Sequence, residues 1–286
     1  MTACGGQSIG SRSTAICTGL PVITSSRSIP VERLRTKLKA VILAGGQGTR
    51  LAPYSVVFPK PLMPIGDMPI LELLLLQLRN SGVTDVIMAV GHLSSLIMAY
   101  FGNGEKIGLT IDYSHEDTPL GTAGPLGLVS GLDKPFFVMN GDLLTDIDFG
   151  AMMDAHTTMG AVATIGLYDR TVKIDLGVIE TDGSQRVVRY IEKPSYSYDV
   201  SMGVYVFEPG VINHIPPNQR FDLPDLVRTL IDRDQSVFGY KHRGYWLDIG
   251  RPDDYRRAQE DFPAMRERML NPRRDAAAPG APSANL

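Results

Sequence analysis

A glycine-rich segment near residue 45 contains the residue types that can bind phosphate. It directly follows an apolar run, and its candidate contact residues are Leu43, Ala44, Gly45, Gly46, Gly48, Thr49 and Arg50. Glycines let the backbone approach a ligand closely, and successive backbone amides form a concave site for phosphate oxygens. Arg50 adds a permanent positive charge with planar donors. For the glycines alone, the alternative is a tight turn between a strand and a helix.

Lys60 is a second candidate cation in the same region. Pro59 and Pro61 flank it and stiffen the backbone, which predicts a positioned cation rather than a mobile surface lysine. The region is not a Walker A loop, because no Gly-Lys-Ser/Thr follows the glycines. It also lacks the Gly-x-Gly-x-x-Gly spacing of a dinucleotide fingerprint, which argues against a nicotinamide-dependent dehydrogenase.

Two aspartates could bind a metal ion. Asp142 follows an apolar strand within Asn140-Gly141-Asp142, and Asp248 follows another apolar stretch far downstream. Ligands of open α/β sheets bind where strands end, and two carboxylates together with substrate phosphates typically hold Mg²⁺. The residues alone do not show that the two aspartates converge. The alternatives are a turn aspartate at 142 and a capping or ion-paired one at 248.

Other polar segments carry weaker signals. Residues 190–194 end a strand with Glu-Lys-Pro, which suits a binding site or an exposed ion pair equally well. Residues 119–126 form a loop before a predicted helix, and the Thr122 side chain could cap that helix. The spacing of Asp146 and Asp148 suits solvent exposure and helix capping. His92 suits the start of a helix better than a ligand contact. The remaining histidines, which show no metal or catalytic spacing, are His115, His156, His214 and His242.

Composition narrows the class of protein. Apolar residues make up 43% and charged residues 21% of the 286 residues, which is ordinary for a globular protein with a sizeable core. The net charge of −3 and a pI of about 6.0 argue against wholesale binding of nucleic acid or an anionic membrane. The only cysteines, Cys4 and Cys17, make a disulfide framework or zinc site very improbable. We expect a soluble, cytoplasmic protein.

Strands and helices alternate in the first half of the chain. We predict strands at residues 39–44, 83–90, 109–113, 136–139 and 161–167, and helices at 70–80, 93–101 and 148–158. The alternation predicts a Rossmann-like, three-layer α/β fold with a mostly parallel sheet and helices on both faces. Shorter strands follow at 177–180, 187–192 and 200–207, and helices return at 223–233 and 253–261.

These patterns define one domain between two tails. We predict a disordered tail at residues 1–37, a domain at 38–265 and a second tail at 271–286. The change of pattern after residue 166 divides the domain into two halves, 38–167 and 168–265. The Ser-, Thr- and Arg-containing N-terminal segment could also be a transit peptide, or the result of a start codon assigned too early.

The glycine segment and the Pro-Lys-Pro segment together resemble the signature of sugar-1-phosphate nucleotidyltransferases. The resemblance runs over about residues 39–262, and it implies that residues 38–167 are a nucleotide-binding half and residues 168–265 a sugar-binding half. It implies that the loop wraps a nucleoside triphosphate and that Arg50 and Lys60 stabilise the leaving pyrophosphate. It also implies that Asp142 and Asp248 hold Mg²⁺, the one cofactor expected. Catalysis is assigned to Arg50, Lys60, Asp142 and Lys193.

The resemblance also assigns the substrate contacts. Gly91, Gly121 and Thr122 are expected near the nucleobase. The sequence around these residues most resembles that of mannose-1-phosphate guanylyltransferases. The expected sugar-phosphate residues are Gly141, Gly177, Glu192, Lys193 and Ser201. Ser201 departs from the asparagine or threonine of many relatives and leaves the sugar open. GTP with mannose-1-phosphate or a related sugar is favoured. Thymidylyl, uridylyl or cytidylyl transfer to glucose-1-phosphate remains an alternative, as does a silent regulatory paralogue. Relatives form dimers or tetramers, but no segment identifies an interface.

Overall fold

The structure is a computed structural model that describes residues 37–46, 48, 51, 57–116 and 118–271. It divides into two units, Met1–Leu34 and Arg35–Leu286, and only the second contains described residues. The predicted N-terminal tail therefore lies outside the described residues except for Lys37, and the predicted C-terminal tail lies outside them except for Asn271. Everything below concerns the second unit.

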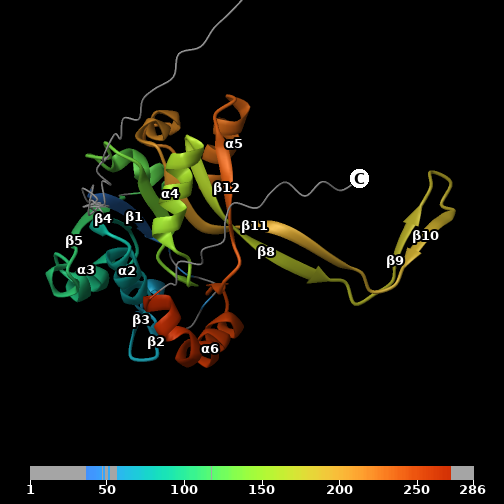
Figure 1. The fold of residues 1–286 in the computed structure, drawn as a ribbon, viewed down its shortest axis with the longest axis horizontal. Coiled ribbons are helices and arrows are strands. Elements are labelled where there is room, and N and C mark those ends of the chain that lie inside the picture. Colours follow the sequence, from blue (N-terminus) through green and yellow to red (C-terminus); the bar gives the residue numbers. More distant parts are fainter. Residues whose placement is uncertain (1–36, 47, 49–50, 52–56, 117, 272–286) are drawn as a thin grey trace, which may run out of the picture. The chain divides into compact units, whose positions relative to one another are not determined.

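The elements alternate along the chain as predicted for an α/β protein (Figure 1). The strands are β1 (Leu38–Ala44), β2 (Pro64–Ile65), β3 (Met68–Pro69), β4 (Val83–Val90), β5 (Thr110–His115), β6 (Phe136–Asn140), β7 (Leu143–Thr145), β8 (Ala163–Lys173), β9 (Val178–Thr181), β10 (Val187–Ile191), β11 (Ser195–Phe207), β12 (Val237–His242) and β13 (Trp246–Asp248). The α-helices are α2 (Ile70–Asn80), α3 (Ser94–Phe101), α4 (Phe149–Met159), α5 (Leu223–Asp232) and α6 (Pro252–Leu270). Short 3-10 helices are η2 (Lys60–Leu62), η3 (Glu105–Ile107), η4 (Gly124–Leu128) and η5 (Pro209–His214).

Seven strands form the central sheet in the order β12-β8-β11-β6-β1-β4-β5. The pairs β1–β4, β1–β6, β4–β5 and β12–β8 are parallel, while β11 runs antiparallel to both β6 and β8. The sheet is therefore mixed but mostly parallel, which confirms the predicted fold class. β1 is paired on both sides, and Ala40, Val41 and Ile42 are fully buried, as expected for an apolar run in a central parallel strand.

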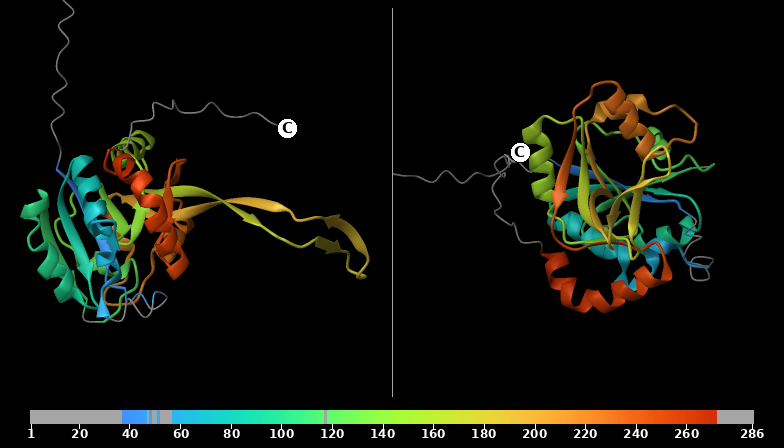
Figure 2. Two further views of the ribbon diagram at one scale, coloured as in Figure 1. Left: turned by 90° about the horizontal axis from the view of Figure 1, so that it is seen from below. Right: turned by 90° about the vertical axis from the view of Figure 1, so that its right-hand side faces the viewer.

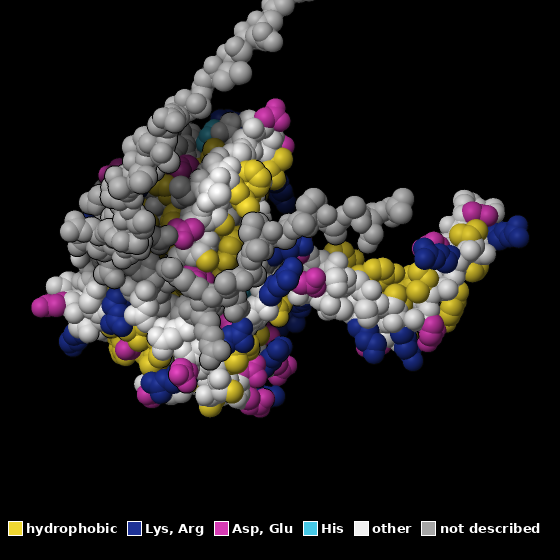
Figure 3. Space-filling model, viewed as in Figure 1, with side chains coloured by type: hydrophobic (Ala, Val, Ile, Leu, Met, Phe, Trp, Pro, Cys, Tyr) yellow, Lys and Arg dark blue, Asp and Glu magenta, His cyan; other side chains and the backbone are white. Residues whose placement is uncertain are grey.

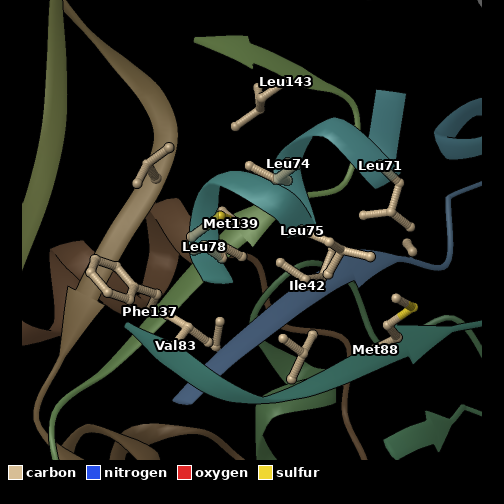
Figure 4. Packing of buried hydrophobic residues seen from close by; sticks show 14 of the residues in the cluster. Ile42, Leu71, Leu74, Leu75, Leu78, Val83, Met88, Phe137, Met139 and Leu143 are labelled. Carbon is tan, nitrogen blue, oxygen red and sulfur yellow. The ribbon is translucent and has the colours of Figure 1, made fainter. Parts of the chain in front are cut away.

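Helices cover both faces of the sheet (Figure 2). One face packs against α2, α3 and α4. Leu71, Leu74, Leu75 and Leu78 recur at helical spacing along α2 and lie over the side chains of β1, β4 and β6 (Figure 4). The other face packs against η4, η5 and α5. A third cluster joins α6 to the start of α2 and to β13. None of the helices in the described ranges is long and apolar enough to cross a bilayer.

Four elements of the described chain, β8, β11, β12 and α6, differ in extent or presence from the sequence-based prediction. β8 and β11 are longer, because their outer ends are alternating rather than continuously apolar and pair with each other from Leu167–Ser201 to Lys173–Ser195. β12 was missed because Gly239 interrupts the apolar pattern of its sequence. The structure needs a glycine there, since a side chain would overlap Leu167. α6 continues through Pro263 to Leu270, five residues beyond the predicted domain end, and buries Met269.

The start of α4 gives a first testable prediction. Asp148 is the N-cap, as predicted, and its Oδ1 accepts a hydrogen bond of 2.9 Å from the Ala151 amide. Asp148→Ala is expected to lower the free energy of unfolding by about 1 kcal/mol and the melting temperature by roughly 2–4 °C. Asp148→Asn keeps an acceptor and should change stability far less. Equal losses in both variants, measured by thermal unfolding, would contradict a capping role.

Candidate active site

A cleft of about 760 Å³ opens where β1, β4, β5 and β6 end. Most of its walls come from the segments that follow these strands. Its lining includes Leu43, Ala44, Gly45, Gly46, Gly48, Lys60, Gly91, His92, Glu116, Gly121, Thr122, Asn140, Asp142, Arg220 and Asp222. Eight predicted nucleotide-binding residues thus line one cavity, while Thr49 and Arg50 lie outside the described residues.

The glycines of the cleft are needed where the backbone is crowded. A Cβ on Gly45 would lie 2.6 Å from Glu116 Oε1 and 3.3 Å from the Gly91 amide nitrogen. Gly121 has φ +81°, and a Cβ there would lie 2.6 Å from Asp222 Oδ1. Larger residues at either position would force neighbouring groups apart and narrow the cleft.

Lys60 brings the two predicted metal-binding aspartates together. Its side chain is 11% exposed, and Nζ contacts Asp142 Oδ2 and lies 3.9 Å from Asp248 Oδ1. The pairing of β13 with β7 places Asp248 opposite Leu143, beside Asp142. Two carboxylates that are far apart in the sequence therefore share one cation at the cleft.

The two aspartates fit an Mg²⁺ ion that takes few ligands from protein. Asp142 Oδ1 is buried and accepts no hydrogen bond from any residue that the structure describes, so one carboxylate oxygen remains available. Within those residues, no three His, Cys, Asp or Glu side chains are grouped as a metal cage. An ion held by Asp142 and Asp248 would therefore need phosphate oxygens and water to complete its coordination.

The cleft lining includes Glu116, a residue that sequence reasoning missed. Glu116 Oε2 accepts a hydrogen bond of 2.9 Å from the Leu120 amide, while Oε1 faces Gly45 and Gly91. Its position directly after β5, at the same sheet edge as Asp142, was the signal available in the sequence. Arg220 and Asp222 were also missed, because they arrive from a loop that precedes α5.

Thr122 has a structural task in the described cleft. Its Oγ1 accepts a hydrogen bond of 2.8 Å from the Leu223 amide, and its own amide donates to Asp222 Oδ1 at 2.9 Å. The Thr122 hydroxyl therefore satisfies an amide at the start of α5.

The predicted sugar-phosphate residues fall into two groups. Gly141 lies beside β1, where its amide donates to the Leu43 carbonyl at 3.0 Å. Ser201 lies two residues from Gly203, where a Cβ would be 2.8 Å from Asn140 Nδ2. Gly177, Glu192 and Lys193 instead belong to the connection between β8 and β11, beyond the outer end of their pairing. That end is about 20 Å beyond Ser201, at roughly 3.3 Å per residue.

The prediction that Asp146 is exposed to solvent is wrong. Its side chain is 1% exposed and lies between three donors: His242 Nε2 at 2.9 Å, the Tyr245 amide at 2.6 Å, and Arg268 Nε. Burial alone would raise the pKa of this carboxyl, but the His242 and Tyr245 hydrogen bonds and the Arg268 charge outweigh it and lower the pKa. Sequence reasoning missed this cluster because Asp146 follows β7, His242 ends β12, Tyr245 lies in the loop before β13, and Arg268 lies in α6.

A mostly parallel sheet whose strand ends hold a glycine loop, a buried lysine and two adjacent carboxylates defines a class of proteins that bind phosphorylated ligands at that edge. Residues 39–264 match the family model described as nucleotidyl transferase. The chain belongs to the nucleotidyl transferase family.

Similar proteins carry more than one substrate name. The chain is 36% identical over 240 residues to the UTP–glucose-1-phosphate uridylyltransferase of Synechocystis sp., covering 76% of this chain and 61% of that protein. It is 34% identical over 232 residues to the mannose-1-phosphate guanylyltransferase of Mycobacterium tuberculosis, covering 79% and 65% respectively. The chain thus spans less than two thirds of the length of these relatives.

Among solved structures, HddC from Yersinia pseudotuberculosis superimposes with a TM-score of 0.62 at 25% identity. The superposition covers 79% of this chain and 99% of that one. Nearly the whole of that structure is therefore represented in the fold described above.

Proposed function

We propose that this chain transfers a nucleoside monophosphate from a nucleoside triphosphate to a sugar 1-phosphate and releases pyrophosphate. One observation carries the proposal: Lys60, on the wall of a glycine-lined cleft, lies between Asp142 and Asp248. Membership of the nucleotidyl transferase family and the names of the relatives support it.

The reaction needs charge neutralisation more than proton transfer. The attacking sugar-phosphate oxygen is already anionic at neutral pH, so catalysis depends on positioning two anions and stabilising the charge that develops on pyrophosphate. Lys60 is placed to supply a cation at the cleft. We assign the same task to Arg50, and binding of the attacking phosphate to Lys193. Mg²⁺ held by Asp142 and Asp248, when bound, would reduce the repulsion between the two phosphate groups.

Glu116 supports GTP as the nucleotide. Its Oε1 lies between Gly45 and Gly91 on the cleft wall, while Oε2 is held by the Leu120 amide. A carboxylate only accepts hydrogen bonds when ionised. Guanine offers adjacent N–H donors at N1 and the exocyclic amine, whereas uracil and thymine offer one flanked by carbonyl oxygens. The favoured sugar is mannose 1-phosphate or a related sugar phosphate, with glucose 1-phosphate as the alternative.

A pyrophosphate-release assay of the purified protein with Mg²⁺ tests this proposal. It crosses GTP, dTTP, UTP, CTP and ATP with mannose, glucose, heptose and N-acetylglucosamine 1-phosphates. Pyrophosphate from one GTP pairing is the expected result. Nucleotide binding by calorimetry without turnover on any pairing would instead favour the silent paralogue.

The nucleobase assignment leads to a specific prediction. Glu116→Gln replaces one acceptor oxygen with a donor and should lower kcat/KM for GTP about 10- to 100-fold, which corresponds to roughly 1–3 kcal/mol. Activity with UTP or dTTP should not fall in parallel. Glu105→Gln, in the exposed helix η3, is the matched control. A uniform loss across all nucleotides would show that Glu116 does not read the base.

A further inference from the structure

A two-stranded arm extends from the central sheet, and its faces differ in polarity. The arm comprises residues 168–200, which include the outer parts of β8 and β11 and the whole of β9 and β10 (Figure 1). Cross-strand pairing puts Tyr168, Arg170, Val172, Tyr196, Tyr198 and Val200 on one face. The opposite face is polar and includes Thr171 and Ser197, whose hydroxyls lie 3.1 Å apart.

The apolar face of the arm lacks a covering layer over much of its length. Val172 is 43% exposed and Tyr198 56%, and on the β9–β10 hairpin Tyr190 is 62% exposed. Figure 3 shows hydrophobic side chains following the arm outward. Antiparallel strands with one apolar and one polar face are adapted to pack that face, and a two-stranded ribbon alone is marginally stable in water. This face is therefore suited to a partner.

The arm leaves the sheet at the edge that carries the cleft. β11 is antiparallel to β6, so its residues before Val204 continue past the end of β6, where Asp142 lies. The root of the arm is fixed. Lys241 Nζ lies 2.9 Å from an Asp199 oxygen, and the Tyr168 and Trp246 rings are 5.2 Å apart. β12 also remains paired with β8 as far as Tyr168.

A fixed root keeps Glu192 and Lys193 away from the cleft of their own chain. The ladder from Leu167–Ser201 to Lys173–Ser195 is uninterrupted, and these two residues lie beyond its far end. Folding the arm back would break that ladder. Within the described part of the cleft, Lys60 already contacts Asp142, and Arg220 Nε lies 3.8 Å from Asp222 Oδ2. Lys193 Nζ likewise lies 3.8 Å from Glu192 Oε1, so the arm adds a further cation with a carboxylate neighbour for a second phosphorylated substrate.

We propose that the arm docks on a second copy of this chain and delivers Glu192 and Lys193 to that copy's cleft. This inference rests on the proposed function. Two copies would exchange arms about a twofold axis, so that each apolar face is covered and each cleft is completed by its partner.

Charge and size favour a second copy over other partners. Residues 168–200 contain five basic and six acidic side chains, a net charge of −1, so two arms do not repel strongly and an anionic partner gains little. The arm has 33 residues. A standard stable interface uses about 20–30 residues on each side. The apolar face of the arm, together with the cleft residues that it would enter, can therefore contribute to an interface of this size.

Complementation between two inactive variants tests delivery in trans. Lys60→Ala disables the cleft and Lys193→Ala disables the arm; the two are co-expressed with different tags, and mixed dimers are isolated by two affinity steps. Each parent is expected to lose at least tenfold in pyrophosphate release, and the mixed dimer to regain about half of wild-type activity, because one of its two sites is intact. Activity of the mixed dimer no higher than that of its parents would overturn the proposal, since each chain then completes its own site.

Sedimentation of the purified chain tests the surface independently of activity. The wild type is expected to be a dimer at micromolar concentration. Val172→Ser with Tyr198→Ser should give a folded monomer, while Thr171→Ala with Ser197→Ala, on the polar face, should remain a dimer. A monomeric wild type, or a dimer that survives the apolar-face changes, would overturn the proposal. If no substrate pair releases pyrophosphate, only the proposed reaction fails, and this measurement still decides the interface.

Discussion

Asp142→Asn is expected to lower kcat for nucleotidyl transfer by about 10²–10³, because asparagine preserves the shape of the side chain but removes its charge. Asp142 contacts the buried ammonium of Lys60 and presents a second, buried oxygen that accepts no hydrogen bond from the described residues. The negative charge of Asp142 is therefore what binds cations in the cleft. The measurement is pyrophosphate release with both substrates saturating.

The control for this prediction is an exposed aspartate. Asp133 has a side chain that is 73% exposed and lies 4.0 Å from Lys39, away from the cleft lining. Asp133→Asn should retain wild-type turnover. Circular dichroism and thermal unfolding of Asp142→Asn should confirm that the fold survives. Turnover within threefold of wild type in a folded Asp142→Asn protein would remove Asp142 from the chemistry.

Sequence reasoning located the cleft because its residues follow strands that are easily recognised. The buried run of β1 and the apolar β6 predict where Gly45 and Asp142 lie, since the ends of parallel strands meet at one edge of the sheet. The proximity of Asp142 and Asp248, by contrast, could not be predicted from local patterns. It depends on the antiparallel pairing of β13 with β7, which the residues alone do not specify. The resemblance to a known family supplied that expectation.

The residues that sequence reasoning missed act through contacts between distant segments. Glu116 lies in the cleft because its carboxylate packs against the glycines Gly45 and Gly91. Asp222 is held there by a hydrogen bond from the Thr122 amide. The outer ends of β8 and β11 were missed because charged residues such as Asp169, Arg170 and Lys173 obscure the alternation that their pairing makes visible. Local patterns thus predict elements, whereas the pairing of elements decides which polar side chains face the cleft.

The buried Asp146 cluster shows the same dependence and connects the fold to the site. Asp146 joins Arg268 of α6 to His242 at the end of β12 and to Tyr245 in the loop that follows. That loop continues directly into β13, which ends at Asp248. His242 Nε2 also lies 3.1 Å from the Tyr245 carbonyl oxygen, so this nitrogen carries the hydrogen. A Cβ on Gly244 would overlap Asp146, which leaves no room for a larger residue.

Asp146→Ala is expected to lower the free energy of unfolding by about 2–3 kcal/mol, because it removes the carboxylate that accepts from the Tyr245 amide and His242 Nε2, while the half-exposed Arg268 can turn to water. The pKa of Asp146 is lowered in the folded state. Its contribution is therefore present above the unfolded pKa of about 3.9 and is lost as the pH falls through the folded value. Denaturant unfolding should show a large difference in the free energy of unfolding between wild type and variant at pH 7, and this difference should narrow below about pH 4.

The control is Asp253→Ala, at a side chain that is 89% exposed, which should cost less than about 1 kcal/mol. A gap that stayed constant from pH 7 to pH 3 would mean that the Asp146 charge does not stabilise the fold.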